Sequence, residues 1–189
     1  MGLANSLTVL RILLVPVFVS LLVYRKPGAA LLVFAGAAFT DLLDGWVARR
    51  SGPSRLGAFL DPMADKLLLT ASFVTLTYMK MLPFWIAAVV ISRDVILVVG
   101  ALLIHILGGR LHPRPTLAGK LATFFQVLTV LSGLLARYFR LPLAPRAILW
   151  LAAVFTILSG LQYIVQGMRF LNAAHGTTPE EERESAYFR

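Results

Sequence analysis

The chain has 189 residues, of which 58% are hydrophobic and only 14% are charged, and its formal net charge is +9. An ordinary soluble domain is about half apolar and about a quarter charged, so this composition excludes that class. The chain has no cysteine, which excludes disulfides, thiol nucleophiles and thiolate metal sites. The basic excess fits loop residues that orient a membrane protein and contact anionic lipid headgroups better than it fits a nucleic-acid surface.

Six stretches of mainly apolar residues follow one another, separated by polar or Gly- and Pro-rich turns. Each stretch is long enough to cross a bilayer about 30 Å thick. The first lacks a basic leader and a small-residue cleavage site, so we expect it to be retained as a helix. We therefore predict an all-α, polytopic membrane protein with six transmembrane helices, at residues 7–24, 29–50, 56–79, 84–107, 116–138 and 145–170. Residues 1–171 are expected to form one domain and residues 172–189 a polar tail.

The acidic residues are distributed unevenly. The apolar body holds five of the nine, and four of these fall within 25 positions: Asp41, Asp44, Asp61 and Asp65. A charge inside a bilayer costs from about 2.5 kcal/mol upward, so such residues usually have a function. The first two are three apart near the end of the second span, and the last two are four apart at the start of the third. Each pair therefore shares a helix face. Because a short loop joins these spans, we expect them to be antiparallel neighbours whose carboxylates meet.

Four carboxylates in a low dielectric need compensation, so either some are protonated or cations lie between them. Oxygen ligands suit hard divalent ions such as Mg²⁺ or Mn²⁺, and four carboxylates suit two ions, an arrangement that supports phosphoryl transfer. The neighbouring Gly45, Ala48 and Gly57 are small enough for a bulky ligand to approach the backbone. Arg49 adds a fixed cation for a phosphate or a carboxylate.

Simpler explanations exist for single members of this set. Asp61 before Pro62 could cap a helix, and the glycines could allow close helix packing in lipid. The acids could also line an ion path, so a small membrane cation or proton transporter is the alternative from another class. That alternative does not explain the small residues and the arginine beside the acids. Transporters also often carry internal repeats, and none is visible in this sequence.

The run from Asp41 to Arg49, followed by Gly57, Asp61 and Asp65, resembles the signature of the CDP-alcohol phosphatidyltransferases. That signature reads D-x2-D-G-x2-A-R and then G-x3-D-x3-D, and all eight fixed positions match. So many fixed residue types at set spacings make a specific signal. The resemblance covers most of the chain and includes the six-span body.

The resemblance implies an enzyme of phospholipid biosynthesis whose catalytic domain is the six-helix body. It would transfer a phosphatidyl group from CDP-diacylglycerol to an acceptor hydroxyl and release CMP. The implied ligands of two divalent ions are Asp41, Asp44, Asp61 and Asp65, of which Asp65 is also the implied general base. The implied contacts of CDP-diacylglycerol are Asp41, Gly45, Ala48, Arg49, Gly57 and Asp61. The family further implies a homodimer in the bacterial inner (cytoplasmic) membrane with its active site facing the cytoplasm, an orientation that the basic loop residues also favour.

The acceptor is less clearly indicated. The residues that resemble a pocket for a phosphorylated acceptor are Thr8, Arg11, Arg93 and Lys120. The simpler role of Arg93 is pairing with Asp94 or snorkelling to the interface. Phosphatidylglycerophosphate synthases usually have Arg-Glu in the fourth span, whereas this chain has Arg-Asp there, which is more like the cardiolipin synthases. The sixth span and the Gly-Lys pair that ends at Lys120 look more like the glycerophosphate enzymes. We expect glycerol 3-phosphate as the acceptor, with phosphatidylglycerol, the acceptor of a cardiolipin synthase, as the alternative.

Overall fold

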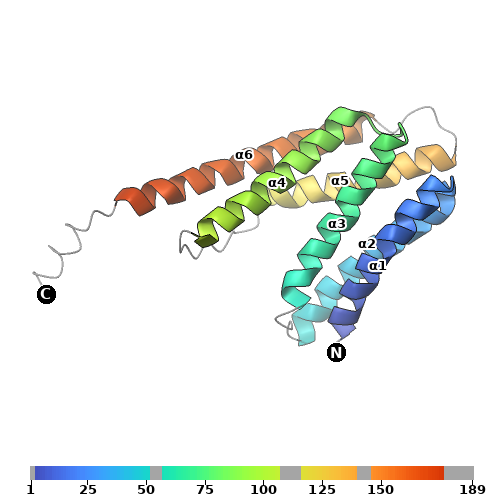
Figure 1. Cartoon of the computed structure of the whole chain (residues 1–189), viewed down its shortest axis with the longest axis horizontal. Coiled ribbons are helices and arrows are strands. Elements are labelled where there is room, and N and C mark those ends of the chain that lie inside the picture. The colour runs from blue at the N-terminus through green and yellow to red at the C-terminus, as the bar shows by residue number, and fades with distance from the viewer. Residues whose placement is uncertain (1–2, 52–56, 107–115, 140–145, 177–189) are drawn as a thin grey trace, which may run out of the picture.

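The structure is a computed structural model whose described residues form six helices and no strand (Figure 1). The described backbone covers residues 3–51, 57–106, 116–139 and 146–176, and the described side chains are those of residues 9–40, 63–103, 106, 116–139 and 146–168. The helices are α1 (Leu3–Val23), α2 (Pro27–Ser51), α3 (Gly57–Tyr78), α4 (Phe84–Ile106), α5 (Leu117–Tyr138) and α6 (Arg146–Gly176). The predicted all-α class with six helices is confirmed.

The helix ends follow local chemistry. Pro27 is the first residue of α2, where its fixed φ suits a helix start and its missing N–H is not needed. The hydroxyl of Thr116 caps α5 by accepting a hydrogen bond from the Gly119 N–H at 3.1 Å. The predicted limits agree with the structure to within a few residues, except that α6 continues to Gly176, six residues past the predicted end of the sixth span.

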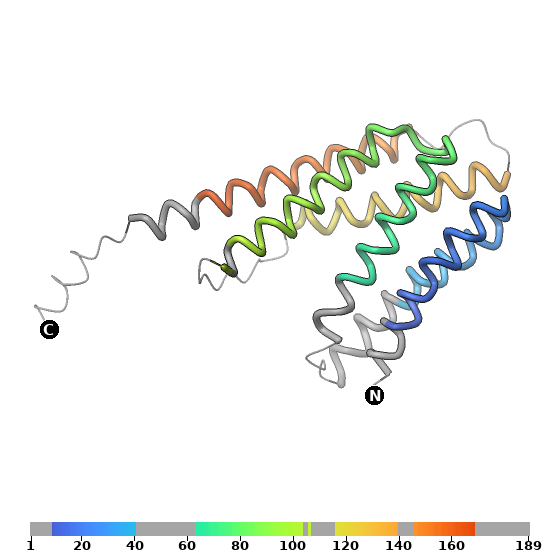
Figure 2. Tube along the Cα trace, in the orientation of Figure 1, coloured from blue at the N-terminus to red at the C-terminus, as the bar shows by residue number. Residues whose placement is uncertain are grey.

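The helices form two groups of three. α1 packs against both α2 and α3, while α6 packs against α4 and α5. The groups touch through contacts of α5 with α2 and α3 and of α4 with α3. They meet at the end of the molecule where α1 turns into α2 and α3 into α4, and they diverge toward the other end (Figures 1 and 2).

The expectation that the second and third spans pack directly on each other needs correction over the described residues. There, the main partner of α3 is α1, while α2 packs against α1 and α5. A short connection brings two helices together only near the residues that it joins, and the remainder of each helix follows the neighbours that bury its apolar face.

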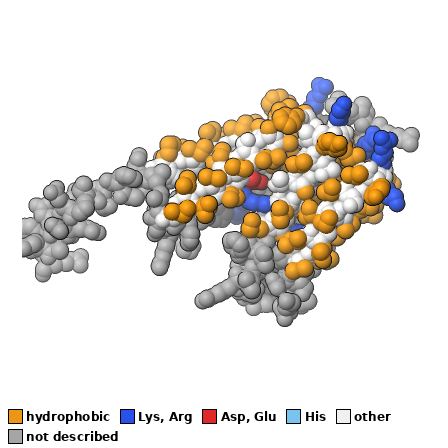
Figure 3. All heavy atoms as spheres, in the orientation of Figure 1, with side chains coloured by type: hydrophobic (Ala, Val, Ile, Leu, Met, Phe, Trp, Pro, Cys, Tyr) orange, Lys and Arg blue, Asp and Glu red, His pale blue; other side chains and the backbone are white. Residues whose placement is uncertain are grey.

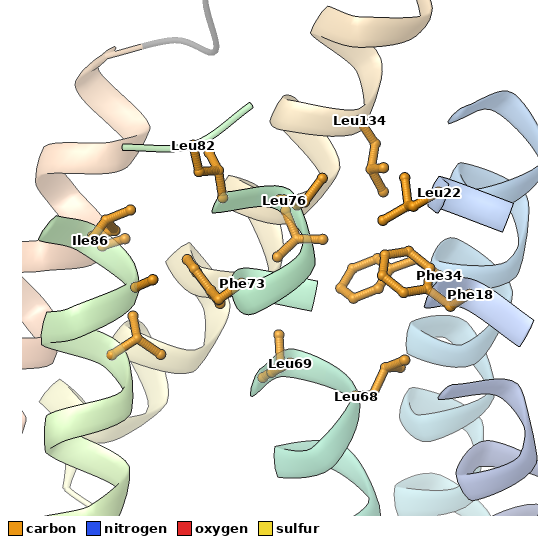
Figure 4. Packing of buried hydrophobic residues seen from close by; sticks show 14 of the residues in the cluster. Phe18, Leu22, Phe34, Leu68, Leu69, Phe73, Leu76, Leu82, Ile86 and Leu134 are labelled. Carbon is orange, nitrogen blue, oxygen red and sulfur yellow. The ribbon is translucent and has the colours of Figure 1, made fainter. Parts of the chain in front are cut away.

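The hydrophobic core lies at the closed end of the two groups (Figure 4). Phe18 of α1 and Phe34 of α2 are buried with ring centroids 5.7 Å apart. Phe73 and Leu76 of α3 are fully buried beside them, and Leu134 closes the cluster from α5. This packing fixes the closed end and leaves the diverging halves of the helices to form a cleft.

The outer surface is mostly hydrophobic (Figure 3). Large apolar side chains are exposed along the described helices, and contiguous apolar surface of this extent is rare on soluble monomers. Within the part of the chain that the structure describes, three segments are long and apolar enough to cross a membrane, namely Phe84–Leu103, Leu117–Tyr138 and Arg146–Met168. Exposed lysines and arginines gather at the closed end of the molecule (Figure 3), as expected for residues at a membrane–water interface.

Candidate active site

A cleft of about 830 Å³ lies between the two groups, and all six helices contribute to its lining. Ligand pockets in proteins span about 300–1,000 Å³, so the cleft is large enough for a sizeable organic substrate. Its polar lining consists of Arg11, Asp65, Arg93, Thr116, Gly119, Lys120, Thr123, Ser159, Tyr163 and Gln166. Its apolar lining comes mainly from residues 34–39 of α2 and residues 124–131 of α5.

An ion pair joins α1 to α3 inside the cleft. The Nη1 atom of Arg11 donates a hydrogen bond to Oδ1 of Asp65. The Arg11 side chain is only 2% exposed, whereas that of Asp65 is 33% exposed. A buried guanidinium needs an anionic partner because its desolvation is costly. Arg11 therefore holds the Asp65 carboxylate at the cleft wall, with the Asp65 side chain partly exposed.

A second polar network links α3, α4 and α6. Arg93 donates one hydrogen bond to the Asp94 carboxylate at 2.8 Å and another to the Ser159 hydroxyl at 3.1 Å. The Lys66 ammonium lies 3.4 Å from the same Asp94 oxygen. The pairing of Arg93 with Asp94 that its sequence context suggested is thus present, and Arg93 also lines the cleft. Asp94 offsets part of the positive charge and fixes the guanidinium in place.

The beginning of α5 lies against this network. If Gly119 carried a Cβ, that atom would be 3.4 Å from the Ser159 hydroxyl and 3.6 Å from Nη2 of Arg93. The glycine therefore brings the first turn of α5 close to the arginine. Lys120 follows it, is exposed and lines the cleft. A helix N-terminus beside two cations forms an electropositive region suited to a phosphate group.

The polar and apolar parts of the cleft are separated along the helices. On α5, Thr116, Gly119 and Lys120 belong to the first turn, and the apolar lining residues follow from Phe124 to Leu131. On α3, Asp65 precedes the apolar Leu68 and Leu69. Along α3 and α5 the cleft is therefore polar toward its open end and apolar toward the core, which suits a molecule with a charged head and hydrocarbon chains. On α4 the order is reversed, since Leu97 lies beyond Arg93 toward the open end.

Three lining residues of α6 were not among the site residues predicted from the sequence. Ser159, Tyr163 and Gln166 follow one another at spacings of four and three, so they share one helix face. This polar stripe in an apolar span is visible in the sequence. Ser159 is buried, Tyr163 is partly buried and Gln166 is exposed. The stripe lines the cleft because α4 and α5 pack against α6, and the sequence did not indicate that packing.

The four aspartates are placed by the backbone. Asp41 and Asp44 lie in the last three turns of α2, and Asp61 precedes Asp65 by one turn in α3. Of these four aspartates, only Asp65 has a described side chain. The described side chains contain no group of three acidic or histidine residues that could hold a metal ion. The described cleft nevertheless includes the partly exposed Asp65 carboxylate, and four carboxylates are the donor set that a hard divalent ion prefers.

The predicted nucleotide contacts also fall on the ends of α2 and α3. The residues concerned are Gly45, Ala48, Arg49, Gly57 and Asp61, whose side-chain placement lies outside the described part, as does that of Thr8. Of the predicted acceptor residues, the cleft brings together Arg11, Arg93 and Lys120.

Comparison with known proteins agrees with the motif and the fold. Residues 1–158 match the family model of the CDP-alcohol phosphatidyltransferases. A probable phosphatidylglycerophosphate synthase of Mycobacterium tuberculosis is 33% identical over 185 residues, which cover 93% of this chain and 86% of the relative. The CDP-diacylglycerol--glycerol-3-phosphate 3-phosphatidyltransferase of Bacillus subtilis is 31% identical over 195 residues, covering 92% and 99%. The human cardiolipin synthase (CMP-forming) is 36% identical over 152 residues, covering 71% and 50%.

The matched region includes the cleft-lining residues of α1 to α5 and the complete aspartate signature, and it ends within α6, just before Ser159. The family consists of membrane enzymes that use divalent metal ions, which accounts for both the apolar surface and the acids. The prediction of an enzyme is therefore confirmed over the transporter alternative. The chain belongs to the CDP-alcohol phosphatidyltransferase family.

Proposed function

We propose that this protein transfers the phosphatidyl group of CDP-diacylglycerol to glycerol 3-phosphate and releases CMP. The observation that carries the proposal is the two-part cleft, in which Arg93 and Lys120 lie at the polar end and apolar walls lead toward the core. The cations would bind the phosphate of the acceptor, while the apolar walls would contact the diacylglycerol chains. The names of the relatives from M. tuberculosis and B. subtilis support the same acceptor.

The proposed metal ligands are Asp41, Asp44, Asp61 and Asp65, which would hold two divalent ions, Mg²⁺ or Mn²⁺. Bound ions of this kind neutralise the charge of a diphosphate and of its leaving group. Beside the aspartates, Gly45, Ala48 and Gly57 would leave room for the cytidine, and Arg49 would bind a phosphate of the nucleotide.

Asp65 would act as the general base. Its carboxylate would take the proton of the acceptor hydroxyl as the hydroxyl oxygen bonds to the phosphorus of the phosphatidyl group and the bond from that phosphorus to the CMP oxygen breaks. The contact with Arg11 supports this role because it holds the carboxylate at the cleft wall. Positioning of this kind can contribute strongly to rate, since a proton transfer requires hydrogen-bond distance and alignment.

The phosphate of the acceptor would bind near Arg93. Asp94 and Ser159 fix the Arg93 guanidinium, and the N–H groups of the first turn of α5 lie beside it. Cardiolipin synthesis is the second candidate, because the human relative carries that name and phosphatidylglycerol would also use the apolar walls. Glycerol 3-phosphate carries a phosphomonoester, which has more negative charge and more free oxygens to bind two cations than the phosphodiester of phosphatidylglycerol.

The bacterial inner membrane is the proposed location, with the active site facing the cytoplasm. The polar end of the cleft lies where α3 and α5 begin. The sequence just before these helices holds Arg55, Arg110 and Arg114, and cytoplasmic loops are rich in such residues. The division into a catalytic domain at residues 1–171 and a polar tail stays a prediction, and so does the homodimer. Light scattering coupled to size-exclusion chromatography would test the homodimer.

A product assay tests the acceptor. Purified protein in detergent receives CDP-diacylglycerol, Mg²⁺ or Mn²⁺, and either glycerol 3-phosphate or phosphatidylglycerol, and the lipid products are separated by chromatography. We expect phosphatidylglycerophosphate from the first acceptor and no cardiolipin from the second. Cardiolipin as the main product would replace the proposed function by the second candidate, and CMP release without any acceptor would indicate hydrolysis.

A further inference from the structure

A second pocket lies at the closed end of the molecule, away from the catalytic cleft. Its volume is about 580 Å³, and its lining comes from three separate parts of the chain: the turn between α1 and α2, the turn between α3 and α4, and the end of α5. The lining residues are Leu22, Arg25, Pro27, Gly28, Met79, Met81, Ala136, Arg137 and Tyr138. None of them was assigned a role by the motif or by the proposed reaction.

The pocket carries positive charge without a described counterion. Arg25 and Arg137 are both exposed in its lining, and the lining contains no acidic residue. Among the described side chains the acids are Asp65 and Asp94, and both are paired inside or beside the catalytic cleft. Two guanidinium groups on one pocket therefore offer donors to an anion from outside the described chain.

The backbone fixes Arg25 at a strained position. Its φ is 55°, in the left-handed region that usually holds glycine at the end of a helix. The turn is closed by hydrogen bonds from the Arg25 N–H to the Leu22 carbonyl at 2.9 Å and from the Lys26 N–H to the Leu21 carbonyl at 2.8 Å. The hydrogen-bonded turn thus fixes the backbone of Arg25 beside the pocket that its side chain lines. Lys80 has the same conformation at the end of α3, with a φ of 57°, but does not line the pocket.

The remaining walls combine a helix start with apolar surface. Pro27 and Gly28 belong to the first turn of α2, and the positive end of that helix dipole favours negative charge. A Cβ on Gly28 would lie 2.8 Å from Cε2 of Tyr138, so the tyrosine ring covers this turn closely. Leu22 and Met79 supply an apolar wall. A free inorganic ion would leave that wall unused.

We propose that this basic pocket binds the phosphate-bearing headgroup of an anionic membrane lipid, with Arg25 and Arg137 on the phosphate and the apolar wall against the glycerol and the first carbons of the chains. The exposed apolar helices place lipid beside the pocket, and basic side chains at a membrane surface attract anionic headgroups. The bound lipid would connect the turns that hold the two three-helix groups together, so its binding stabilises the fold without taking part in the transfer reaction.

Thermal unfolding of the full-length protein in a neutral detergent tests the proposal. The additives are phosphatidylglycerol, phosphatidylcholine at the same mole fraction, and sodium phosphate. We expect phosphatidylglycerol to raise the Tm by at least about 3 °C over phosphatidylcholine, the shift that a ligand at roughly tenfold its dissociation constant gives in a chain of this size. The double variant Arg25→Gln/Arg137→Gln should lose this shift, and the matched control Lys80→Gln should keep it.

CMP release serves as the control for correct folding of the variants. The double variant should retain wild-type CMP release, which shows that it is folded. If the two substitutions together destabilise the protein, each single variant is measured instead and should show part of the Tm shift with phosphatidylglycerol. A shift that persists in the double variant but disappears in Lys120→Gln would place the lipid in the catalytic cleft and overturn the proposal. An equal shift with sodium phosphate alone would overturn the assignment to a lipid headgroup.

Discussion

Arg11 of α1 and Asp65 of α3 form an ion pair across 54 positions of sequence, with the arginine buried and the carboxylate partly open to the cleft. The pair has a structural consequence, because it ties the two helices together beside the α1–α3 packing. It also has a consequence for the proposed reaction, because the carboxylate held by Arg11 is the proposed base.

Removing the arginine should therefore affect both stability and turnover. We expect Arg11→Met to destabilise the protein by roughly 3 kcal/mol, at the low end for a broken buried pair because Asp65 is one-third exposed. CMP release should fall by at least about tenfold. Thermal unfolding in detergent and a CMP assay measure the two effects. The control Arg11→Lys keeps the charge and should recover part of the stability and part of the CMP release. If Arg11→Met had the stability and CMP release of wild type, Arg11 would not position Asp65.

Arg93 should determine the affinity for a phosphorylated acceptor. We expect Arg93→Gln to raise the KM for glycerol 3-phosphate at least about tenfold, because a hydrogen bond to a charged group contributes about 1.5–3 kcal/mol. Steady-state kinetics with varied acceptor at saturating CDP-diacylglycerol measures this constant. Lys66→Gln is the matched control, since Lys66 contacts the same Asp94 but does not line the cleft. A normal KM in Arg93→Gln would move the phosphate site elsewhere.

The contact between α5 and α6 depends on a buried polar pair. The Gln126 amide donates a hydrogen bond to the Thr156 hydroxyl at 3.0 Å, and both residues are buried. We expect Thr156→Val to cost about 1–2 kcal/mol, because the amide loses its acceptor inside an apolar interface. The double variant Gln126→Leu/Thr156→Val should recover much of this loss. Unfolding of the four proteins gives the coupling energy, and additive effects of the two substitutions would show that the pair contributes nothing.

Metal removal should stop the reaction without unfolding the protein. Excess EDTA should abolish CMP release, and added Mg²⁺ or Mn²⁺ should restore it, because the proposed aspartates bind the ions that hold the diphosphate. Asp61→Asn should lose activity at standard metal concentration while keeping a sharp unfolding transition. Glu180→Gln, which neutralises an acid of the polar tail, is the control and should behave as wild type. Full activity in EDTA would exclude the metal site.

Much of the architecture could be predicted because it depends on local properties of the sequence. Apolar length predicts membrane helices, and the spacings of three and four put each pair of aspartates on one helix face. The contacts that build the cleft are different in kind. Arg11 meets Asp65, and Arg93 meets Ser159 66 positions later. Such pairs depend on how helices pack, and helical periodicity gives the face of a residue but not the neighbour of that face. The packing of α1 between α2 and α3 was missed for the same reason.

We propose that Asp65 and the other three acids of the signature carry out phosphatidyl transfer to glycerol 3-phosphate. The most direct test measures the release of labelled CMP, with and without acceptor, by wild type and by Asp65→Asn. Each protein is purified with Mg²⁺ or Mn²⁺ present. We expect release in wild type only when glycerol 3-phosphate is added, and a loss of at least about a hundredfold in the variant, the lower range for removal of a general base. Undiminished release by a folded Asp65→Asn protein would contradict this proposal.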